Sequence, residues 1–164
     1  MTTLFYSHSD CLQHDPGSGY PESPQRLSQI LERLNDSEFA PLLRRKAPKI
    51  DAAQISRVHD IQYVQSILQV SKSTETIEID ADTRLTPQSV DPILRSAGAV
   101  IAAVDDVMAG KANNAFCAGR PPGHHASKAQ AMGFCFFNNV ALGARHALEA
   151  HGLERVAIMD FDVH

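Results

Sequence analysis

The apolar positions along the chain predict strands alternating with helices. Leu4-Phe5-Tyr6 and residues 115–118 are short apolar runs bounded by polar or turn-forming residues, which is typical of buried strands. Residues 155–161 form a near-continuous apolar run with β-branched side chains, the pattern of a parallel strand covered on both faces. A helical pattern precedes this last run. Strand, helix and strand in that order predict a βαβ unit and an α/β fold.

Several helices are predicted by apolar spacing and by residues typical of helix ends. Ser23 before Pro24 predicts an N-cap and a first helical position. A longer helix is predicted from about residue 90 to residue 108, and another from residue 138 or 139 to about 150, with Gly152 as its stop. Residues 71–89 are polar and are predicted as a surface loop.

Composition narrows the classes of function. The 164 residues are 43% hydrophobic and 21% charged, which is ordinary for one soluble globular domain. The net charge of −4 argues against a nucleic-acid or anionic-membrane partner, and no apolar stretch is long enough to span a bilayer. Three scattered cysteines without a C-x-x-C pair indicate reduced thiols. We therefore expect a cytoplasmic protein that uses neither nucleic acid nor a membrane.

Two clusters of chemically active residues follow predicted strands. R-P-P-G-H-H, ending in His124 and His125, comes after the run at 115–118, and Asp162 and His164 come after the run at 155–161. Ligands bind where the carboxyl ends of parallel strands open into a crevice, so we expect both clusters in one site. In an extended chain Asp160, Asp162 and His164 share a face, and a carboxylate with an imidazole suits zinc or iron. Asp160 would orient a histidine or hold a second cation.

The tandem histidines are suited to proton transfer, because imidazole titrates near neutral pH. Two imidazoles with different partners can differ in charge, so that one is a neutral base and the other is held protonated. Gly133 and Phe134 open an aromatic run that is either core or the lining of a slot for an alkyl chain. Cys135 is a poor nucleophile in such apolar surroundings.

These motifs resemble those of the histone deacetylase superfamily, which includes acetylpolyamine amidohydrolases and acetoin-utilisation proteins. R-P-P-G-H-H-A, G-F-C-F-F-N-N-V-A and R-V-A-I-M-D-F-D-V-H are similar to that family's blocks, in the same order and in the class II style. G-Y-P-E-S-P-Q-R-L resembles another block, with Tyr20 where the family usually has histidine. The fold implied is the three-layer α/β/α, arginase-like one with a mostly parallel sheet.

The resemblance implies roles for individual residues in a zinc-dependent deacetylase. Asp162 and His164 would bind the catalytic zinc, and His125 would be the general base. His124 would be its electrostatic partner, held by Asp160. A structural potassium ion would be held by Asp160, Asp162 and the His164 carbonyl. Gly133 and Phe134 would line the acyl tunnel, Arg26 would lie near an internal channel, and the substrate would be an acetyl-lysine peptide or an acetylated polyamine.

In the family, the third zinc ligand and a catalytic tyrosine lie far downstream of the Asp-x-His block. A catalytic zinc usually takes three protein ligands, and this chain offers two at that block. We therefore expect residues 1–164 to be the N-terminal portion of a single deacetylase domain, incomplete at its C-terminus and inactive by itself. A homo-oligomer is compatible with the sequence.

Two other functions fit the same residues. One of His124 and His125, together with Asp162 and His164, would make the two-histidine, one-carboxylate set of an iron oxygenase. Alternatively, the chain is a non-catalytic acyl-binding or assembly module whose missing layers come from a partner. Dependence on oxygen and ferrous iron marks the first alternative, and a folded, zinc-free chain that binds acetylated ligand marks the second.

Overall fold

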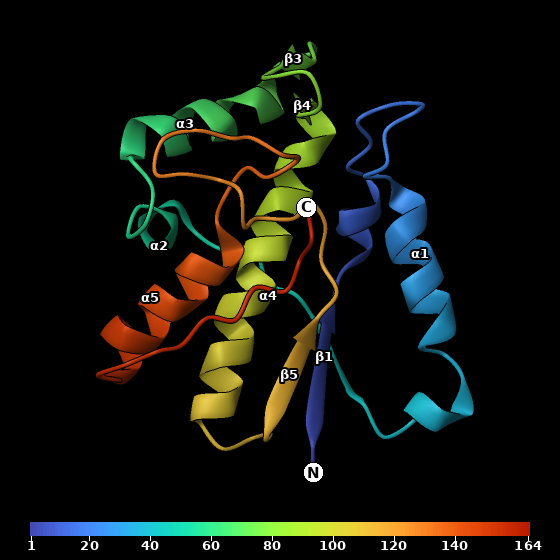
Figure 1. Ribbon diagram of the computed structural model, residues 1–164, viewed down its shortest axis with the longest axis vertical. Helices are drawn as coiled ribbons and strands as arrows, with labels where there is room; N and C mark the ends of the chain where they lie inside the picture. The colour runs from blue at the N-terminus through green and yellow to red at the C-terminus, as the bar shows by residue number, and fades with distance from the viewer.

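The computed structural model describes residues 1–164 and consists of a small parallel sheet with helices on both faces (Figure 1). The strand order is β2 (Leu43–Lys46), β1 (Thr3–Ser7) and β5 (Asn114–Cys117), so the first strand of the chain is the central one. Both pairings are parallel, and Leu4 lies opposite Leu43 of β2 and Ala115 of β5. The predicted α/β class and the first predicted strand are confirmed.

Alternate residues of β1 face different helices, as the two-residue period of a strand requires. Leu4 and Tyr6 pack in a cluster with alanines of α4 (Val90–Met108). Phe5 lies in the cluster on the opposite face, with Leu27 of α1 (Pro24–Arg33). Figure 1 shows α1 and α4 on either side of the strands. The sheet is therefore the middle layer of three.

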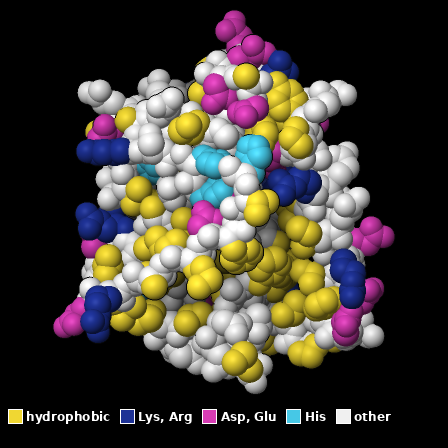
Figure 2. Space-filling view, in the orientation of Figure 1, with side chains coloured by type: hydrophobic (Ala, Val, Ile, Leu, Met, Phe, Trp, Pro, Cys, Tyr) yellow, Lys and Arg dark blue, Asp and Glu magenta, His cyan; other side chains and the backbone are white.

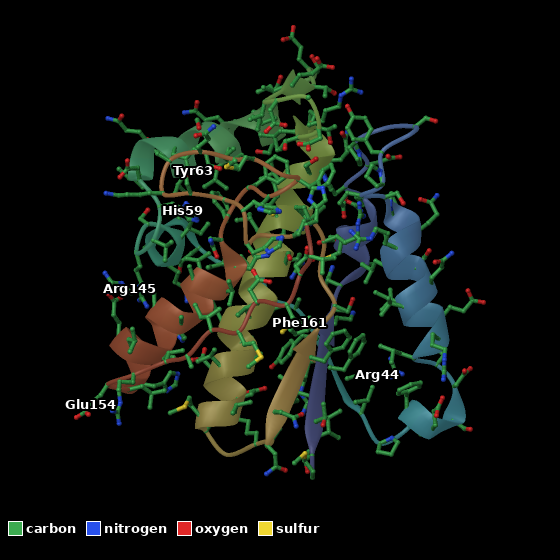
Figure 3. All side chains as sticks on the ribbon, viewed as in Figure 1. Arg44, His59, Tyr63, Arg145, Glu154 and Phe161 are labelled. Atoms are coloured by element: carbon green, nitrogen blue, oxygen red, sulfur yellow. The ribbon has the colours of Figure 1, made fainter.

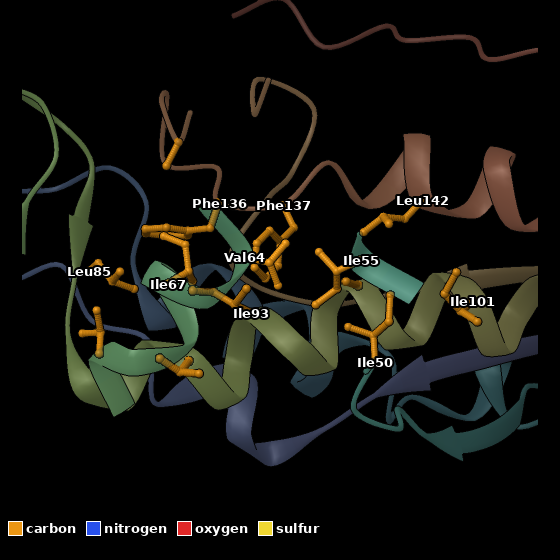
Figure 4. Packing of buried hydrophobic residues seen from close by; sticks show 14 residues of the cluster. Ile50, Ile55, Val64, Ile67, Leu85, Ile93, Ile101, Phe136, Phe137 and Leu142 are labelled. Atoms are coloured by element: carbon orange, nitrogen blue, oxygen red, sulfur yellow. The ribbon is translucent and has the colours of Figure 1, made fainter. Parts of the chain in front are cut away.

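The largest apolar cluster lies on the other side of α4, away from the sheet. It comprises 14 buried residues from α2 (Ala52–Ile55), α3 (Ile61–Gln69), α4, α5 (Asn139–His151) and the segments between them (Figure 4). Phe136 and Phe137, on the segment before α5, are almost fully buried in it. A Cβ at Gly98 of α4 would lie 2.1 Å from the Pro48 carbonyl oxygen, so a glycine is required where that segment crosses the helix. The helix α4 thus packs against the sheet on one side and against α2, α3 and α5 on the other, and it fixes their relative positions.

The predicted helix ends are confirmed. Pro24 is the first residue of α1 and Ser23 its N-cap, and α4 spans residues 90–108 as expected. Asn138 caps α5 by accepting the Ala141 N–H at 3.0 Å, and Gly152 ends that helix with a φ of +66°. None of the helices combines the length and the apolar character that crossing a bilayer would require.

The polar segment predicted as a loop at residues 71–89 contains a short hairpin instead. Ile77 pairs with Leu85 and Glu78 with Arg84, which makes β3 (Ile77–Glu78) antiparallel to β4 (Arg84–Leu85). The Asp80 carboxylate closes the turn by accepting the N–H of Thr83 at 2.7 Å. Short 3-10 turns complete the chain: Ser9–Leu12, Ser37–Phe39, Val70–Lys72 and Pro87–Ser89.

The prediction of a buried strand at residues 155–161 is wrong. These residues form no strand, and Phe161, labelled near the tip of β5 in Figure 3, is 89% exposed. Strand β5 is consequently an edge strand, and its Phe116 is 48% exposed rather than buried. Apolar, β-branched residues form a strand only when a neighbouring strand satisfies their backbone groups and covering layers bury their side chains. The segment instead passes in front of α4 (Figure 1) and borders an open cavity of about 670 Å³, which α4, β5 and the start of α5 also line.

Candidate active site

The loop that carries the tandem histidines is anchored by Arg120. Arg120 is 5% exposed and donates to both carboxylate oxygens of Glu22, at 2.6 and 2.5 Å. It also donates to the carbonyls of Cys11 and His14, at 3.1 and 3.0 Å. The peptide bond that follows, Arg120–Pro121, is cis. The hydrogen bonds of Arg120 therefore hold the end of β5 against the segment that precedes α1.

A second anchor lies at the start of α5. The Asn138 side-chain amide donates to the carbonyls of His124 and Ala126, at 3.3 and 3.1 Å. The Asn138 backbone N–H donates to Nε2 of His59 at 2.9 Å, and His59 lies beside Tyr63 (Figure 3). A Cβ at Gly123 would lie 2.5 Å from the backbone of Phe137, so only glycine allows this close approach. The histidine loop is therefore held from both ends.

The two histidines and Asp160 come together as expected. The ring centroids of His124 and His125 are 4.1 Å apart, and Nδ1 of His124 donates to Oδ2 of Asp160 at 2.9 Å. This hydrogen bond from His124 lowers the pKa of the Asp160 carboxyl below its ordinary value. Because Nδ1 carries the proton of a neutral His124, its Nε2 is left as the acceptor. Figure 2 shows histidine side chains gathered on this face of the molecule.

His125 lies between Gly133 and the last residue of the chain. Its ring centroid is 6.2 Å from that of His164, with the planes at 80°. A Cβ at Gly133 would lie 2.6 Å from Cδ2 of His125, so the glycine brings its backbone against the imidazole. The tandem histidines and the terminal Asp-x-His segment, which are 39 positions apart for His125 and His164, therefore meet at one place.

Asp162 and His164 do not alternate along an extended strand. The N–H of Asp162 donates to Oδ1 of Asp160 at 3.1 Å, and the N–H of His164 donates to Oδ1 of Asp162 at 2.9 Å. These two turns replace the extended conformation predicted for residues 160–164, and all three side chains are exposed. In this structure three potential metal donors lie within 4.8 Å of one another at the C-terminal ends of α4 and α5, not here.

Phe134, the other residue predicted to bind substrate, has a strained backbone. Its φ is +65°, in the left-handed region that a bulky side chain rarely adopts. Its N–H donates to Oγ1 of the buried Thr83 at 3.0 Å, which holds the turn against the β3–β4 hairpin. Strain of this kind persists where the surroundings impose it, often at functional sites.

Arg26 lies apart from the histidines. It is exposed and lines a smaller cavity of about 200 Å³ between α1 and β5, together with Glu22 and Arg120. Three residues border both this cavity and the larger one beside His124, namely Cys117, Gly119 and Pro122. Arg26 is therefore separated from the histidine cluster by the strip of chain that follows β5.

Cys135 is not a nucleophile in this arrangement. Burial raises the pKa of its thiol to about 11, so the thiolate is scarce at neutral pH. Burial raises the thiol pKa of Cys117 to about 11 as well, and all three cysteines are free.

The buried His14 predicts a loss of stability in acid. Burial and the nearby Arg120 guanidinium lower its pKa from 6.5 to about 4. The Glu22 carboxylate lies 3.5 Å from His14, but it forms its ion pair with Arg120. Below pH 6.5 the unfolded chain binds a proton that the folded protein does not. The free energy of unfolding should therefore fall by up to about 3 kcal/mol between pH 7 and pH 4 through this group alone.

The measurement is urea unfolding of the wild-type protein and of H14N at several pH values. The asparagine amide can keep the 2.8 Å hydrogen bond between His14 Nδ1 and Ser89. We expect the variant to lose about 3 kcal/mol less than the wild type over this pH range. Parallel curves for the two proteins would show that His14 is not the group responsible.

Several residues of the site were not predicted to hold the histidine loop or the Phe134 turn. Glu22, His59, Thr83 and Asn138 hold the histidine loop and the Phe134 turn through contacts between distant parts of the chain. Glu22 lay within a block already singled out, G-Y-P-E-S-P-Q-R-L, and an acidic residue beside a structured turn was the available signal. His59 and Thr83 lie in two further stretches that resemble family blocks, V-H-D-I-Q-Y-V and D-A-D-T-R-L-T-P-Q-S, but nothing in those stretches indicates which residues they contact.

Comparisons with known proteins agree with this geometry. The family profile described as "Histone deacetylase domain" matches residues 20–164. A histone deacetylase-like amidohydrolase of Pseudomonas aeruginosa is 38% identical over 154 residues, which is 93% of this chain and 40% of that protein. The human polyamine deacetylase HDAC10 is 35% identical over 87% of this chain and 22% of its own length.

A solved structure, the HD domain of HDA15, superposes on 91% of this chain and 44% of its own length, with a TM-score of 0.86 and 28% identity. The chain thus spans less than half of each of these three relatives. The expected deacetylase-like α/β fold is confirmed by this match. On the profile match, and with the fold to support it, the chain belongs to the histone deacetylase superfamily.

Proposed function

We propose that this chain carries part of the catalytic apparatus of a zinc-dependent amidohydrolase that removes acetyl groups from amines. The observation that carries the proposal is the meeting of His124, His125, Asp160 and His164 at the end of β5. Imidazoles suited to proton transfer lie beside the terminal segment that carries the carboxylate and imidazole proposed to hold a metal. Family membership supports the same reaction class and a metal requirement in general.

The types of donor at the terminal segment fit zinc. A carboxylate from Asp162 and an imidazole from His164 are both common zinc ligands. Oδ1 of Asp162 accepts the His164 N–H, and its Oδ2 makes no hydrogen bond within the protein, so Oδ2 is the oxygen available to a metal. Because a catalytic zinc usually takes three protein ligands, we propose that the third comes from outside residues 1–164, and that these residues alone are inactive.

His125 is the proposed general base. The chemistry that zinc supplies when bound is a water pKa lowered toward about 7 and a polarised acetyl carbonyl. His125, held against Gly133 and facing His164, would take the proton from the attacking water and later give it to the leaving amine. The bonds that change are the amide C–N bond, which breaks, and the C–O bond to water, which forms. The products are acetate and a free amine.

His124 has a different partner and therefore a different role. Its Nδ1–H donates to the Asp160 carboxylate, which fixes the orientation of the ring. A protonated His124 would stabilise negative charge that develops on the carbonyl oxygen. Asp160 and Asp162, with the His164 carbonyl, would hold the structural potassium ion. Hard cations of this kind take carboxylate and carbonyl oxygens.

The proposed substrate is an acetyl-lysine peptide or an acetylated polyamine. Gly133 exposes backbone beside His125, and the half-buried Phe134 ring follows it on the same turn, so the two would line an acyl slot. The name of the human relative indicates that polyamine deacetylation occurs among similar proteins. Arg26 would border an internal channel that begins at the smaller cavity.

Acetate release tests the proposal. The complete gene product is stripped of metal, reloaded with one equivalent of zinc, and assayed on an acetylated lysine peptide and an acetylated polyamine. We expect acetate from at least one substrate, dependent on zinc and unaffected by removing oxygen, and none from residues 1–164 alone. Turnover that requires ferrous iron and oxygen would support an oxygenase instead, and binding of acetylated ligand without turnover would support a non-catalytic module.

A further inference from the structure

A second group of metal-binding side chains lies where α4 and α5 pack together. Asp105 is in the last turn of α4, and His146 and His151 are in the last two turns of α5. Nε2 of His146 and Nε2 of His151 both contact the same oxygen of Asp105, at 2.6 and 2.7 Å. This cluster shares no residue with the candidate active site, and neither the mechanism nor the family blocks use it.

The geometry points to a divalent-metal site, and we propose that zinc, or a transition metal of similar preference, binds Asp105 and the two Nε2 atoms. One donor atom of each residue lies within 4.8 Å of the others, whereas ligands around a tetrahedral zinc are about 3.4 Å apart. A metal would replace the two hydrogens that now lie between the imidazoles and the carboxylate. Small movements of side chains, without any movement of the helices, would complete the coordination.

The surroundings favour a cation with access to water. The His146 side chain is 8% exposed and the Asp105 side chain 50% exposed, so the site is buried on one side and open to solvent on the other. The open side leaves a fourth position for water. Both helices also end here, and the negative ends of their dipoles favour positive charge. The pKa of Asp105, which burial alone would raise, is lowered by the hydrogen bonds from both histidines.

Arg57 contacts His146 on the side away from Asp105 and should affect the affinity for the metal. Its Nη1 lies 3.3 Å from Nδ1 of His146, and its Nε lies 3.7 Å from the Glu149 carboxylate. Arginine can only donate, so Nδ1 of His146 is the acceptor and the ring proton is on Nε2. Metal binding at Nε2 would move that proton to Nδ1 and displace Arg57 toward Glu149. Replacing Arg57 with a hydrogen-bond acceptor should therefore tighten binding.

A metal bound at this site would crosslink the C-terminal ends of α4 and α5. Since the unfolded chain lacks this arrangement of ligands, metal binding would favour the folded state by mass action. At a free zinc concentration of about 100 times the Kd, the unfolding constant should fall about 100-fold. Such a site would stabilise the α4–α5 layer without contributing to catalysis.

The experiment uses tag-free, metal-stripped protein titrated with Zn²⁺ by calorimetry and with Co²⁺ by visible absorption. We expect a binding event that survives H164A, which separates it from the candidate catalytic metal. The same event should weaken by more than about tenfold in D105N and in H146Q, because even second-shell losses cost about 10–100-fold in affinity. R57Q should bind up to about tenfold more tightly.

H8Q is the matched control, since His8 also lies beside a carboxylate, Asp10, but without a second histidine. D105N changes a half-exposed side chain, so the test does not depend on the buried His146 variant folding. Absence of any metal binding in the H164A protein would overturn the proposal. So would binding that D105N, H146Q and R57Q all leave unchanged.

Discussion

Replacing Arg120 with methionine is expected to lower the free energy of unfolding by about 3–5 kcal/mol. The loss of the attraction between Arg120 and Glu22 is only part of the cause. Glu22 is 1% exposed and both of its oxygens accept from Arg120, so the variant leaves a buried carboxylate without its partner. The carbonyls of Cys11 and His14 also lose their donor. Urea unfolding at pH 7 measures the difference.

R33M is the matched control for this prediction. Arg33 also contacts two carboxylates, Asp36 and Glu38, but its side chain is 56% exposed. Exposed ion pairs contribute about 0–1 kcal/mol, so R33M should be nearly neutral. A double variant, E22M with R120M, should recover part of the loss because no buried charge remains unpaired. Equal effects of R120M and R33M would mean that burial does not decide the energetics of this pair.

Replacing His125 with alanine is expected to lower kcat for acetate release by about 10²–10⁴-fold in the complete gene product. The proposed role is proton transfer, so zinc content and KM should change little. Its ring contacts Gly133 and faces His164, and no hydrogen bond through its imidazole supports the fold. Stability should therefore change less than activity. Steady-state kinetics with metal analysis gives both quantities.

K128A is the control on the same loop, because the Lys128 side chain is 76% exposed and contacts only Asp60 across 3.4 Å. It should leave kcat within about twofold of the wild type, as expected for a surface substitution away from the reacting atoms. Turnover of H125A close to that of the wild type would exclude His125 as the base. Loss of zinc together with activity would instead indicate that His125 is a ligand.

The sequence predicted well those features that depend on neighbouring residues. The bounds of α4 follow from its apolar spacing, and the ends of α5 follow from Asn138 and Gly152, because caps are local chemistry. The strand at residues 155–161 was wrong for the opposite reason. An apolar, β-branched run indicates a preference for the strand conformation. A strand also needs a neighbouring strand to pair with, and the pattern of one segment does not show whether that neighbour is present. The exposure of Phe116 on β5 has the same cause.

The candidate site divides in the same way. The contact of His124 with Asp160 was implied by the resemblance to the family, and it forms although residues 155–161 are not a strand. The residues that fix this contact could not be predicted, because Glu22 lies 98 positions before Arg120 and His59 lies 79 positions before Asn138. Such long-range hydrogen bonds leave no periodicity or spacing to read. The proposed metal site at Asp105, His146 and His151 has no sequence signal, because its members lie on two helices.

The central place of β1 has a consequence for biosynthesis. Strand β1 leaves the ribosome before either of its neighbours, which are made later, at residues 43–46 and 114–117. About 70 residues separate those neighbours, so at about 5–20 residues per second one flank of β1 waits several seconds after the other can form. During that interval Phe5 and Tyr6 can pair with β2 alone, so one edge of β1 stays unpaired until β5 is made.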